Sequence, residues 1–279
     1  MTRVIKLNPK RVEKSKIKLA ARVLKRGGLV AFPTETVYGL AANALDAESV
    51  KKVFEAKGRP ADNPLIVHIA EKEQVYRLAK KVPEKAEKLM DKFWPGPLTI
   101  VLEKSRVVPK ATTGGRNTVA VRMPDNRIAL ALIREAGVPL AAPSANSFGK
   151  PSPTSAEHVF QDLCGKIDVI LDGGNTDIGV ESTVLDLTTD PPTLLRPGGI
   201  TLEKLKTVLD RVRMHPAAKG KKTRAVAKSP GMKYKHYAPN ADVILVEGRR
   251  PKLERKVQQL ADRYRKEGKA VGEIGRAHV

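Results

Sequence analysis

The sequence is poor in cysteine and in aromatic residues. Its 279 residues contain one cysteine, Cys164, and only 4% of them are Phe, Trp or Tyr. A single cysteine excludes an internal disulfide and a cysteine-based zinc site. The chain also lacks His-x-x-x-His and His-Glu-x-x-His pairs, which argues against a catalytic metal held by histidines. We therefore expect no metal site built by the protein alone.

Long apolar runs are also missing. No run approaches the ~20 residues that a membrane-spanning helix requires. The N-terminal segment MTRVIKLNPKRVEK lacks the apolar centre of a signal peptide. The hydrophobic content of 41% still permits a substantial core, and the length suits one large domain or two smaller ones. We expect a cytoplasmic protein that does not contact a membrane.

Acidic residues are scarce in three segments, and this locates the net charge of +22. Residues 1–26 carry ten Lys or Arg and one acid, residues 211–240 carry nine and none, and residues 241–279 carry ten against six. Residues 27–210 are neutral, with 23 of each sign. Such basic segments suggest contact with polyanions such as nucleic acid, or a highly charged surface of the thermophile type. Because few aromatic residues accompany the cations, weak RNA binding stays one of two interpretations.

The stretch GGLVAFPTETVYG, residues 27–39, has the form of a buried strand that leads into a site. Leu29 to Phe32 is a short apolar run, and Pro33 ends it because proline has no N–H for a sheet ladder. The polar residues Thr34, Glu35, Thr36 and Tyr38 follow at once. Ligands of open α/β sheets bind beyond strand ends. The alternative interpretation is a loop whose hydroxyls cap the next helix.

Hydrophobic periodicity predicts strands and helices along residues 15–209. The predicted strands cover residues 29–32, 64–70, 98–102, 118–122, 139–142, 169–171, 183–187 and 193–195. The predicted helices cover residues 15–26, 47–56, 72–80, 83–93, 125–136 and 202–209, with a further helix after a capping box formed by Thr154 and Glu157. Asp46 is the predicted N-cap of the second helix.

Polar side chains gather where these elements end. The sequence has neither GxxxxGK[ST] nor GxGxxG, so neither familiar phosphate loop is present. Instead Lys57, Arg59, Arg122 and Arg196 lie at element ends, beside clusters of Ser, Asn and Thr. Each cation alone is more often a solvated surface charge. Their joint placement favours a site for a polyphosphate or a carboxylate.

Eight segments in order resemble one family: PTETVYGL (33–40), KGRP (57–60), NPLIVHI (63–69), FWPGPLT (93–99), VAVRMP (119–124), APSAN (142–146), ESTVLDL (181–187) and LRPGGI (195–200). Together they resemble the YrdC-like threonylcarbamoyl-AMP synthases, over about residues 15–210. The segment SPGMKYKHYAP (229–239) resembles the linker of the longer, two-domain form. ADVILVEG (241–248) resembles the first strand of that form's C-terminal domain.

The resemblance implies an α/β fold: a twisted, open, mixed β-sheet flanked by helices over residues 1–210. A basic linker, residues 211–240, should cover the active site, and residues 241–279 should form part of a small α/β domain. Such a domain needs ~100 residues for its own core, and 39 follow Asn240. These predict a strand over 241–248, a helix near 252–267 and part of a strand at 270–271. The closing EIGRAHV matches a translated sequencing-adapter read-through, so we expect a truncated domain that packs poorly.

The implied activity joins L-threonine, bicarbonate or CO2, and ATP into threonylcarbamoyl-AMP and pyrophosphate, with Mg²⁺ accompanying ATP. Downstream tRNA threonylcarbamoyl-transfer proteins would use the product to make N6-threonylcarbamoyladenosine in tRNA. An alternative is a module of the same fold that binds double-stranded RNA or tRNA. The related carbamoyl transferase of hydrogenase maturation carries cysteine-rich zinc fingers, so the single cysteine excludes that architecture.

Family resemblance also implies roles for individual residues. The threonine pocket is formed by Thr36, His68, Arg122, Ala142 and Ser182. The nucleotide is surrounded by Lys57, Arg59, Asn63, Thr118, Ser144, Asn146, Ser152, Arg196 and Tyr234. The catalytic signature is Lys57, Arg59, Ser144 and Asn146, and in the linker His236 and Tyr237 lie over the adenylate. The chemistry is mainly positioning and charge stabilisation and needs no protein nucleophile. Glu35 and Glu181 either orient hydroxyls or magnesium, or are solvated or capping residues.

Overall fold

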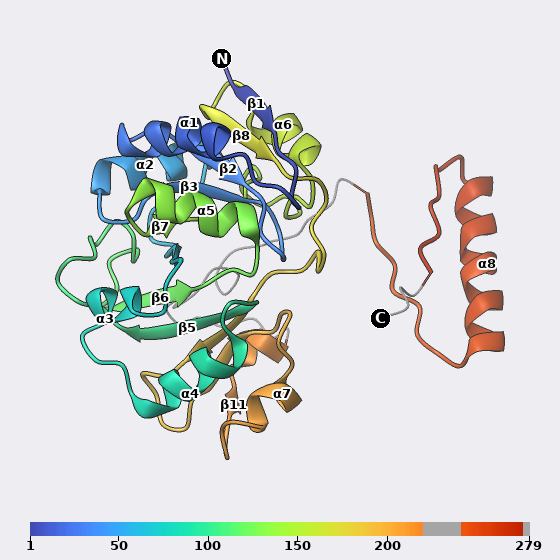
Figure 1. Cartoon of the computed structure of the whole chain (residues 1–279). Helices are drawn as coiled ribbons and strands as arrows, with labels where there is room; N and C mark the ends of the chain where they lie inside the picture. Colours follow the sequence, from blue (N-terminus) through green and yellow to red (C-terminus); the bar gives the residue numbers. More distant parts are fainter. Residues whose placement is uncertain (220–240, 276–279) are drawn as a thin grey trace. The chain divides into compact units, whose positions relative to one another are not determined.

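The computed structural model describes residues 1–219 and 241–275 (Figure 1). The strands are β1 (Arg3–Lys6), β2 (Val30–Phe32), β3 (Gly39–Asn43), β4 (Ile66–His68), β5 (Leu98–Glu103), β6 (Thr118–Arg122), β7 (Leu140–Ala141), β8 (Val169–Asp172), β9 (Thr183–Asp186), β10 (Thr193–Arg196) and β11 (Arg213–Met214). The helices are α1 (Lys14–Lys25), α2 (Ala47–Lys57), α3 (Gln74–Leu78), α4 (Glu84–Phe93), α5 (Arg127–Ala136), α6 (Ala156–Leu163), α7 (Leu202–Lys206), the 3₁₀ helix η1 (Pro216–Lys219) and α8 (Arg250–Lys266).

The strands form one sheet in the order β1-β8-β2-β3-β7-β4-β6-β5-β9-β10-β11. Parallel pairs such as β4 with β6 and β5 with β9 alternate with antiparallel pairs such as β2 with β3 and β5 with β6. The sheet is therefore mixed and open, with β1 and β11 at its edges. The predicted fold class is confirmed.

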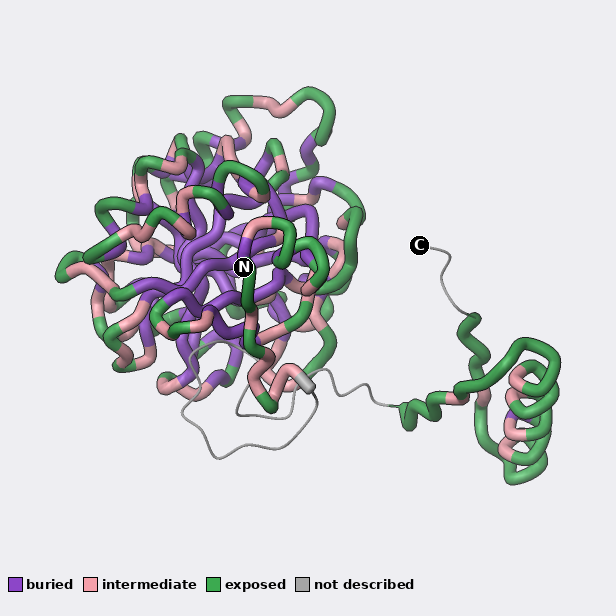
Figure 2. Tube along the Cα trace, turned by 90° about the horizontal axis from the view of Figure 1, so that it is seen from below, coloured by how far each residue is buried: buried purple, intermediate pink, exposed green. Residues whose placement is uncertain are grey.

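Both faces of the sheet are buried, because successive strand residues point to opposite sides. In β2, Val30 and Phe32 belong to a hydrophobic cluster that includes α1 and α5, whereas Ala31 belongs to a second cluster that includes α2, α4 and α6. Helices α1 and α5 lie side by side in one layer (Figure 1). Figure 2 shows the resulting buried interior. A sheet covered in this way leaves its strand ends and loops as the places where polar groups gather.

Local sequence explains most helix boundaries. Ile17, Ala20 and Leu24 are buried along one side of α1, as their spacing predicts. Asp46 caps α2, because its carboxylate accepts hydrogen bonds from the backbone N–H groups of the second and third residues that follow it. The predicted capping box of α6 was wrong by one residue. Ser155 is the N-cap and accepts from the backbone of His158, since its hydroxyl serves as well as that of the preceding threonine.

Three short strands were not predicted: β1, β3 and β11. Strand β3, with the sequence GLAAN, contains no β-branched or aromatic residue, so propensity gives no signal for it. It forms because it returns antiparallel to β2, with Gly39 opposite Phe32. A Cβ at Gly39 would lie 3.1 Å from the Phe32 ring, so a side chain here would require the ring to move by a few tenths of an ångström. Tertiary pairing, not local preference, makes this strand.

The chain divides into two compact units, Met1–Ala238 and Pro239–Val279. In the second, the described residues 241–275 form the helix α8 near the expected place. The predicted strands at 241–248 and 270–271 are wrong for these residues: neither segment is extended in a ladder, because no described strand lies there to pair with. Apolar side chains such as Leu245 are exposed, and Ala261 is the one buried apolar residue of the described part. No described helix combines the length and apolarity that a membrane crossing requires.

Candidate active site

A hollow lies where strand ends and loops of the first unit meet. It is lined by residues from seven segments, most of them polar or charged: Thr34, Thr36, Val37, Gly39, Arg59, Ile66, His68, Arg122, Ala142, Pro143, Ser144, Asn146, Lys150, Ser152, Glu181, Ser182 and Arg196. A larger hollow of about 500 Å³ beside Arg26, Lys52 and Lys166 contains none of the predicted site residues. The chemistry of the lining residues therefore identifies the smaller hollow as the candidate site.

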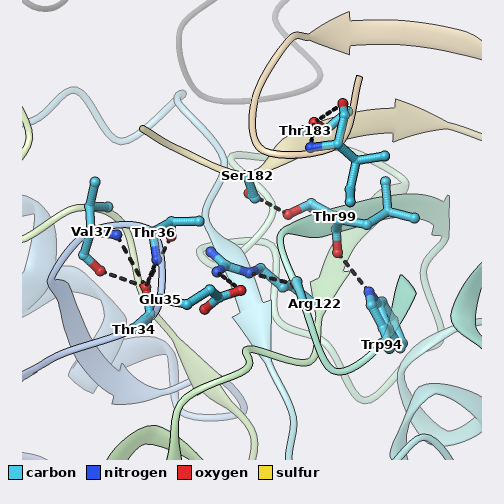
Figure 3. Close-up of polar contacts among 12 residues, drawn as sticks. Thr34, Glu35, Thr36, Val37, Trp94, Thr99, Arg122, Ser182 and Thr183 are labelled. Atoms are coloured by element: carbon cyan, nitrogen blue, oxygen red, sulfur yellow. Dashed lines mark hydrogen bonds and ion pairs between the residues drawn. The ribbon is translucent and has the colours of Figure 1, made fainter. Parts of the chain in front are cut away.

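The loop after β2 forms one wall, and Thr34 gives it its shape. The Thr34 hydroxyl donates to the carbonyl of Val37 at 2.6 Å and accepts from the backbone N–H groups of Thr36 and Val37 at 3.2 Å (Figure 3). It also lies 3.0 Å from the Thr36 hydroxyl. Such side-chain bonds replace a regular turn. The threonines therefore order this loop, and do not cap a following helix.

The floor is made by two neighbouring parallel strands. His68 ends β4 and Arg122 ends β6, and the two are register partners. Arg122 Nη2 lies 2.7 Å from Glu35 Oε1, with the two side chains 4% and 6% exposed. Arg122 Nε donates to the carbonyl of Gly96 at 3.3 Å. Glu35 faces Arg122 in Figure 3 but does not line the hollow. The carboxylate thus compensates the buried guanidinium, whose free side is turned to the hollow.

His68 is uncharged at neutral pH. Burial, and then the nearby charge of Arg122, lower the pKa of His68 to about 3. Nδ1 lies 3.3 Å from the carbonyl of Ile66, which can only accept, so Nδ1 carries the proton. Phe32 packs edge-on against the ring at 6.1 Å between centroids. His68 is therefore a fixed polar wall of the hollow and does not act as a base near pH 7.

On the opposite side Ser182 joins two partners. Its hydroxyl lies 2.7 Å from Thr99 Oγ1 (Figure 3). It also accepts from Arg196 Nη2 at 3.2 Å. Arg196 also donates twice to the carbonyl of Ser182, at 3.1 and 2.9 Å. A Cβ on Gly198 would lie 2.2 Å from the carbonyl oxygen of Glu181, so only glycine lets the loop after β10 approach this closely. That approach brings Arg196 and Ser182 together.

Lys57 supports the loop after β7 from behind. Its ammonium donates to the carbonyls of Ser144 and Asn146, and Lys57 is buried and does not line the hollow. Burial, and then the charge of Arg59, hold the pKa of Lys57 well below its usual value. In this structure Lys57 therefore orders the Ser144–Asn146 loop and makes no direct contact with the hollow.

Several polar atoms on the side predicted to bind nucleotide have no partner among the described residues. Asn63 is buried, and neither its Nδ2 nor its Oδ1 makes a hydrogen bond there. Asn146 Oδ1 likewise makes no hydrogen bond among the described residues, although Asn146 Nδ2 donates to the carbonyls of Ser147 and Lys150. Arg59 Nη2 donates to the carbonyls of Asn63 and Pro64 at 3.3 and 3.1 Å. Buried polar atoms without partners are rare in proteins and require an explanation.

The hollow brings together most of the predicted site residues. It is lined by all five of the threonine set and by five of the nucleotide set: Arg59, Ser144, Asn146, Ser152 and Arg196. Lys57, Asn63 and Thr118 do not line it, and the last begins β6 opposite Glu103. The predicted Tyr234 and the lid residues His236 and Tyr237 lie outside the described residues.

Sequence predicted no binding role for Lys150 and Thr99, and it left two interpretations open for Glu181. Lys150 lines the hollow and pairs with Asp162 at 2.7 Å, and Glu181 lines it and accepts from the Ser152 hydroxyl. Thr99 is buried behind Ser182, although it is the last residue of the quoted motif FWPGPLT. Membership of a motif was the available signal for Thr99. Nothing in the sequence marks which way its side chain points.

The open mixed sheet and its cation-lined hollow define an α/β enzyme of the YrdC-like class. A family model described as telomere recombination, for the Sua5, YciO and YrdC proteins, matches residues 22–198. A model of the threonylcarbamoyl-AMP synthase C-terminal domain matches residues 200–278. The chain belongs to the threonylcarbamoyl-AMP synthase family, whose members are nucleotidyltransferases.

Individual relatives support this assignment. The threonylcarbamoyl-AMP synthase of Pyrococcus abyssi is 60% identical over 275 residues, which span 99% of this chain and 80% of that protein. The Bacillus subtilis enzyme is 52% identical over 254 residues, covering 91% of this chain and 72% of its own. A crystal structure of P. abyssi Sua5 complexed with L-threonine is similar with a TM-score of 0.94 and 58% identity, over 100% of this chain and 81% of that one.

Proposed function

We propose that this protein makes threonylcarbamoyl-AMP and pyrophosphate from L-threonine, bicarbonate or CO2, and ATP. One observation carries the proposal: a single hollow is lined both by residues suited to an amino acid and by residues suited to phosphate. The reaction requires these two substrates side by side, because the carbamate formed on threonine must reach the α-phosphorus of ATP. Aligned reactants contribute ~7–11 kcal/mol to such a step.

Arg122 is proposed to bind the carboxylate of threonine. Its guanidinium is held by Glu35 and by the carbonyl of Gly96 and still lines the hollow. Thr36, His68, Ala142 and Ser182 complete the pocket. His68 is neutral at physiological pH, so it adds no second positive charge that would repel the amino group of the substrate. That amine has to lose its own proton before it attacks CO2, and the geometry assigns His68 no part in that transfer.

Arg59 and Arg196 are proposed to bind the phosphates. As pyrophosphate leaves, negative charge grows on the phosphate oxygens, and preorganised cations stabilise it without reorganisation. Ser144, Asn146 and Ser152 line the same side, and Lys57 keeps their loop in place through two carbonyls. Asn63 offers a buried amide whose two polar atoms have no partner among residues 1–219 and 241–275. Predicted contacts of Thr118 and Tyr234 with the nucleotide stay predictions.

Magnesium is proposed to arrive with ATP. Among residues 1–219 and 241–275 no group of three or more His, Cys, Asp or Glu is arranged to hold a metal ion. A resident site built by the described side chains therefore does not fit, and no step is assigned to the ion. Glu181 is the one carboxylate in the lining of the hollow.

The test is pyrophosphate release from purified protein with L-threonine, bicarbonate and Mg-ATP. We expect release that depends on all three substrates, together with a threonylcarbamoyl adenylate visible by mass spectrometry. Omission of threonine or bicarbonate is the matched control. ATP hydrolysis that ignores both, or binding of RNA without any adenylate, would contradict the proposal.

The product is proposed to serve tRNA modification. An anhydride between a carbamate and a phosphate is reactive in water, so a second protein must consume it soon after release. We expect downstream threonylcarbamoyl-transfer proteins to move the group to an adenosine of tRNA. The measurement is transfer of label from [¹⁴C]threonine to tRNA in a mixture with those proteins, which should require this chain and ATP.

A further inference from the structure

The hydroxyl of Thr99 is isolated from every polar group except one. Thr99 is fully buried in β5, and the hydrogen bond to Ser182 Oγ at 2.7 Å is its one side-chain contact of this kind among the described residues (Figure 3). Thr99 does not line the hollow, whereas Ser182 does. Neither the predicted threonine pocket nor the predicted nucleotide site includes Thr99.

This isolation fixes the direction of the bond. A hydroxyl has one hydrogen to donate and two lone pairs to accept. If Ser182 donated to Thr99, the buried Thr99 hydrogen would have no acceptor, which costs more than a made hydrogen bond contributes. Thr99 must therefore donate and Ser182 accept.

Arg196 occupies the other lone pair of Ser182. Its Nη2 donates to Ser182 Oγ at 3.2 Å, and a guanidinium has no capacity to accept. With both lone pairs filled, the hydrogen of Ser182 is left over and the hydroxyl borders the hollow. Ser182 consequently presents a donor to whatever binds there.

We propose that Thr99 is a positioning residue that holds the Ser182 hydroxyl as a hydrogen-bond donor for the carboxylate of the amino-acid substrate. This inference rests on the proposed function, which places an amino acid in the hollow. The ammonium group of an amino acid only donates, so a donor at Ser182 cannot pair with it. The carboxylate only accepts, and the charges of Arg122 and Arg196 on either side favour an anionic group at this point.

The experiment measures binding of L-threonine to the full chain by calorimetry. Thr99→Val keeps the shape and removes the hydroxyl. It should lower the affinity for L-threonine about two- to tenfold, which corresponds to the free energy of one neutral hydrogen bond. The KM for threonine should rise by the same factor, with the KM for ATP unchanged. Thr99→Ser, which keeps the hydroxyl, should stay within about twofold of wild type.

A ligand without the carboxylate provides the matched control. (R)-1-Amino-2-propanol is L-threonine without the carboxyl group and offers no acceptor there, so its affinity should be the same for wild type and Thr99→Val. Thr99→Val in the protein and removal of the carboxylate from the ligand then form a thermodynamic cycle. In this cycle Thr99→Val should weaken binding only when the ligand carries the carboxylate. Should Thr99→Val fold poorly in a thermal melt, Thr99→Ala removes the same hydroxyl and gives the same comparison, with a loss for L-threonine and none for (R)-1-amino-2-propanol.

Two results would overturn the inference while leaving the proposed function intact. One is equal L-threonine affinity for wild type and Thr99→Val. The other is a loss in Thr99→Ser as large as in Thr99→Val, since that would trace the effect to packing at position 99 and not to the hydroxyl. A wild-type protein that binds no L-threonine would overturn the inference and the proposed function together.

Discussion

The two sides of the hollow differ in how their buried polar groups are compensated before any ligand binds, by paired charges on one side and by no partner on the other. On the proposed threonine side Arg122 and Glu35 compensate each other's charge at 2.7 Å, although Arg122 Nη2 and both Glu35 oxygens make no hydrogen bond in the described part of the chain, and Ser182 has Thr99 and Arg196 as partners. On the proposed nucleotide side Asn63 is buried with neither amide atom bonded in the described part of the chain, and Asn146 Oδ1 is also unpaired there. The first side is already organised, whereas the second has capacity left for a ligand.

This difference predicts different responses to substitution. A residue inside a satisfied network stabilises the fold and the ligand at once, so its removal lowers both. A residue with an unpaired buried group costs stability in the free protein and recovers it on binding. Substitutions on the threonine side should therefore lower stability as well as binding. Those on the nucleotide side should lower binding with little loss of stability.

The largest effect is expected at the buried ion pair. Arg122→Ala leaves the Glu35 carboxylate buried without its partner, which should lower the free energy of unfolding by about 3–5 kcal/mol. Binding of L-threonine should be lost as well. Urea unfolding and calorimetry measure the two effects.

The double variant Arg122→Met with Glu35→Leu is the control for this prediction. Replacing both charges by apolar groups should recover most of the stability, because no unpaired charge is left, while threonine binding stays absent. Unchanged stability in Arg122→Ala would show that the ion pair does not stabilise the fold. It would also contradict the proposed difference between the two sides of the hollow.

The next effect concerns turnover. Arg59→Ala and Arg196→Ala each remove a cation proposed to contact phosphate, worth on the order of 1.5–3 kcal/mol, so pyrophosphate release should fall roughly ten- to a hundredfold. Arg196→Ala should also raise the KM for threonine, since Arg196 bonds Ser182, whereas Arg59→Ala should not. Arg134→Ala, which removes an exposed partner of Glu71, is the control. Wild-type turnover in both site variants would show that Arg59 and Arg196 do not contribute to catalysis.

The pH dependence of the free energy of unfolding should contain a contribution from His68. The folded pKa of about 3 lies below the ordinary value of 6.5, so between these values the unfolded chain binds a proton that the folded chain does not. Stability is therefore complete above pH 6.5 and falls as the pH is lowered toward 3. The slope is about 1.4 kcal/mol per unit, or about 2 kcal/mol at pH 5. His68→Gln should lose this part of the slope in urea unfolding, and identical slopes would contradict it.

Much of the fold could be predicted from the sequence, and the physical reasons can be named for each element. Helix α1 was predictable because its buried residues repeat at helical spacing, and α2 because Asp46 caps it. Strand β3 was not, because GLAAN has no strand preference and is defined by pairing with β2. The strand expected at 241–248 had the right composition, but a strand needs a neighbour and none is present among the described residues.

For the site, sequence predicted which residues gather and not how they are oriented. Arg122 and His68 were both expected in the pocket, but their adjacency follows from the parallel register of β4 and β6. Lys57 was expected at the phosphates and instead holds a loop by its carbonyls. The partners Glu35 and Thr99 lay within quoted motifs. Only tertiary structure shows that one compensates Arg122 and the other bonds Ser182.

The smallest effect on stability is expected for a substitution at Asn63. This substitution gives the sharpest test of the difference between the two sides of the hollow. Its amide is buried and unpaired among the described residues, so Asn63→Leu replaces a polar group that gains nothing in the free protein with an apolar one of similar size. The free energy of unfolding should stay within about 1 kcal/mol of wild type or rise. The KM for ATP should rise about tenfold, because the amide is proposed to bond the nucleotide.

Thr112→Val is the matched control for Asn63→Leu. Thr112 is equally buried and, like Asn63, does not line the hollow, but its hydroxyl already donates to the carbonyl of Ala44 at 2.7 Å. Its removal should cost about 1 kcal/mol of stability and leave the KM for ATP unchanged, the opposite pattern to Asn63→Leu. Thermal melts and pyrophosphate release measure both quantities on the same samples. If Asn63→Leu instead lost stability and kept its ATP affinity, the unpaired amide would have a structural role, and the two sides of the hollow would not differ as described.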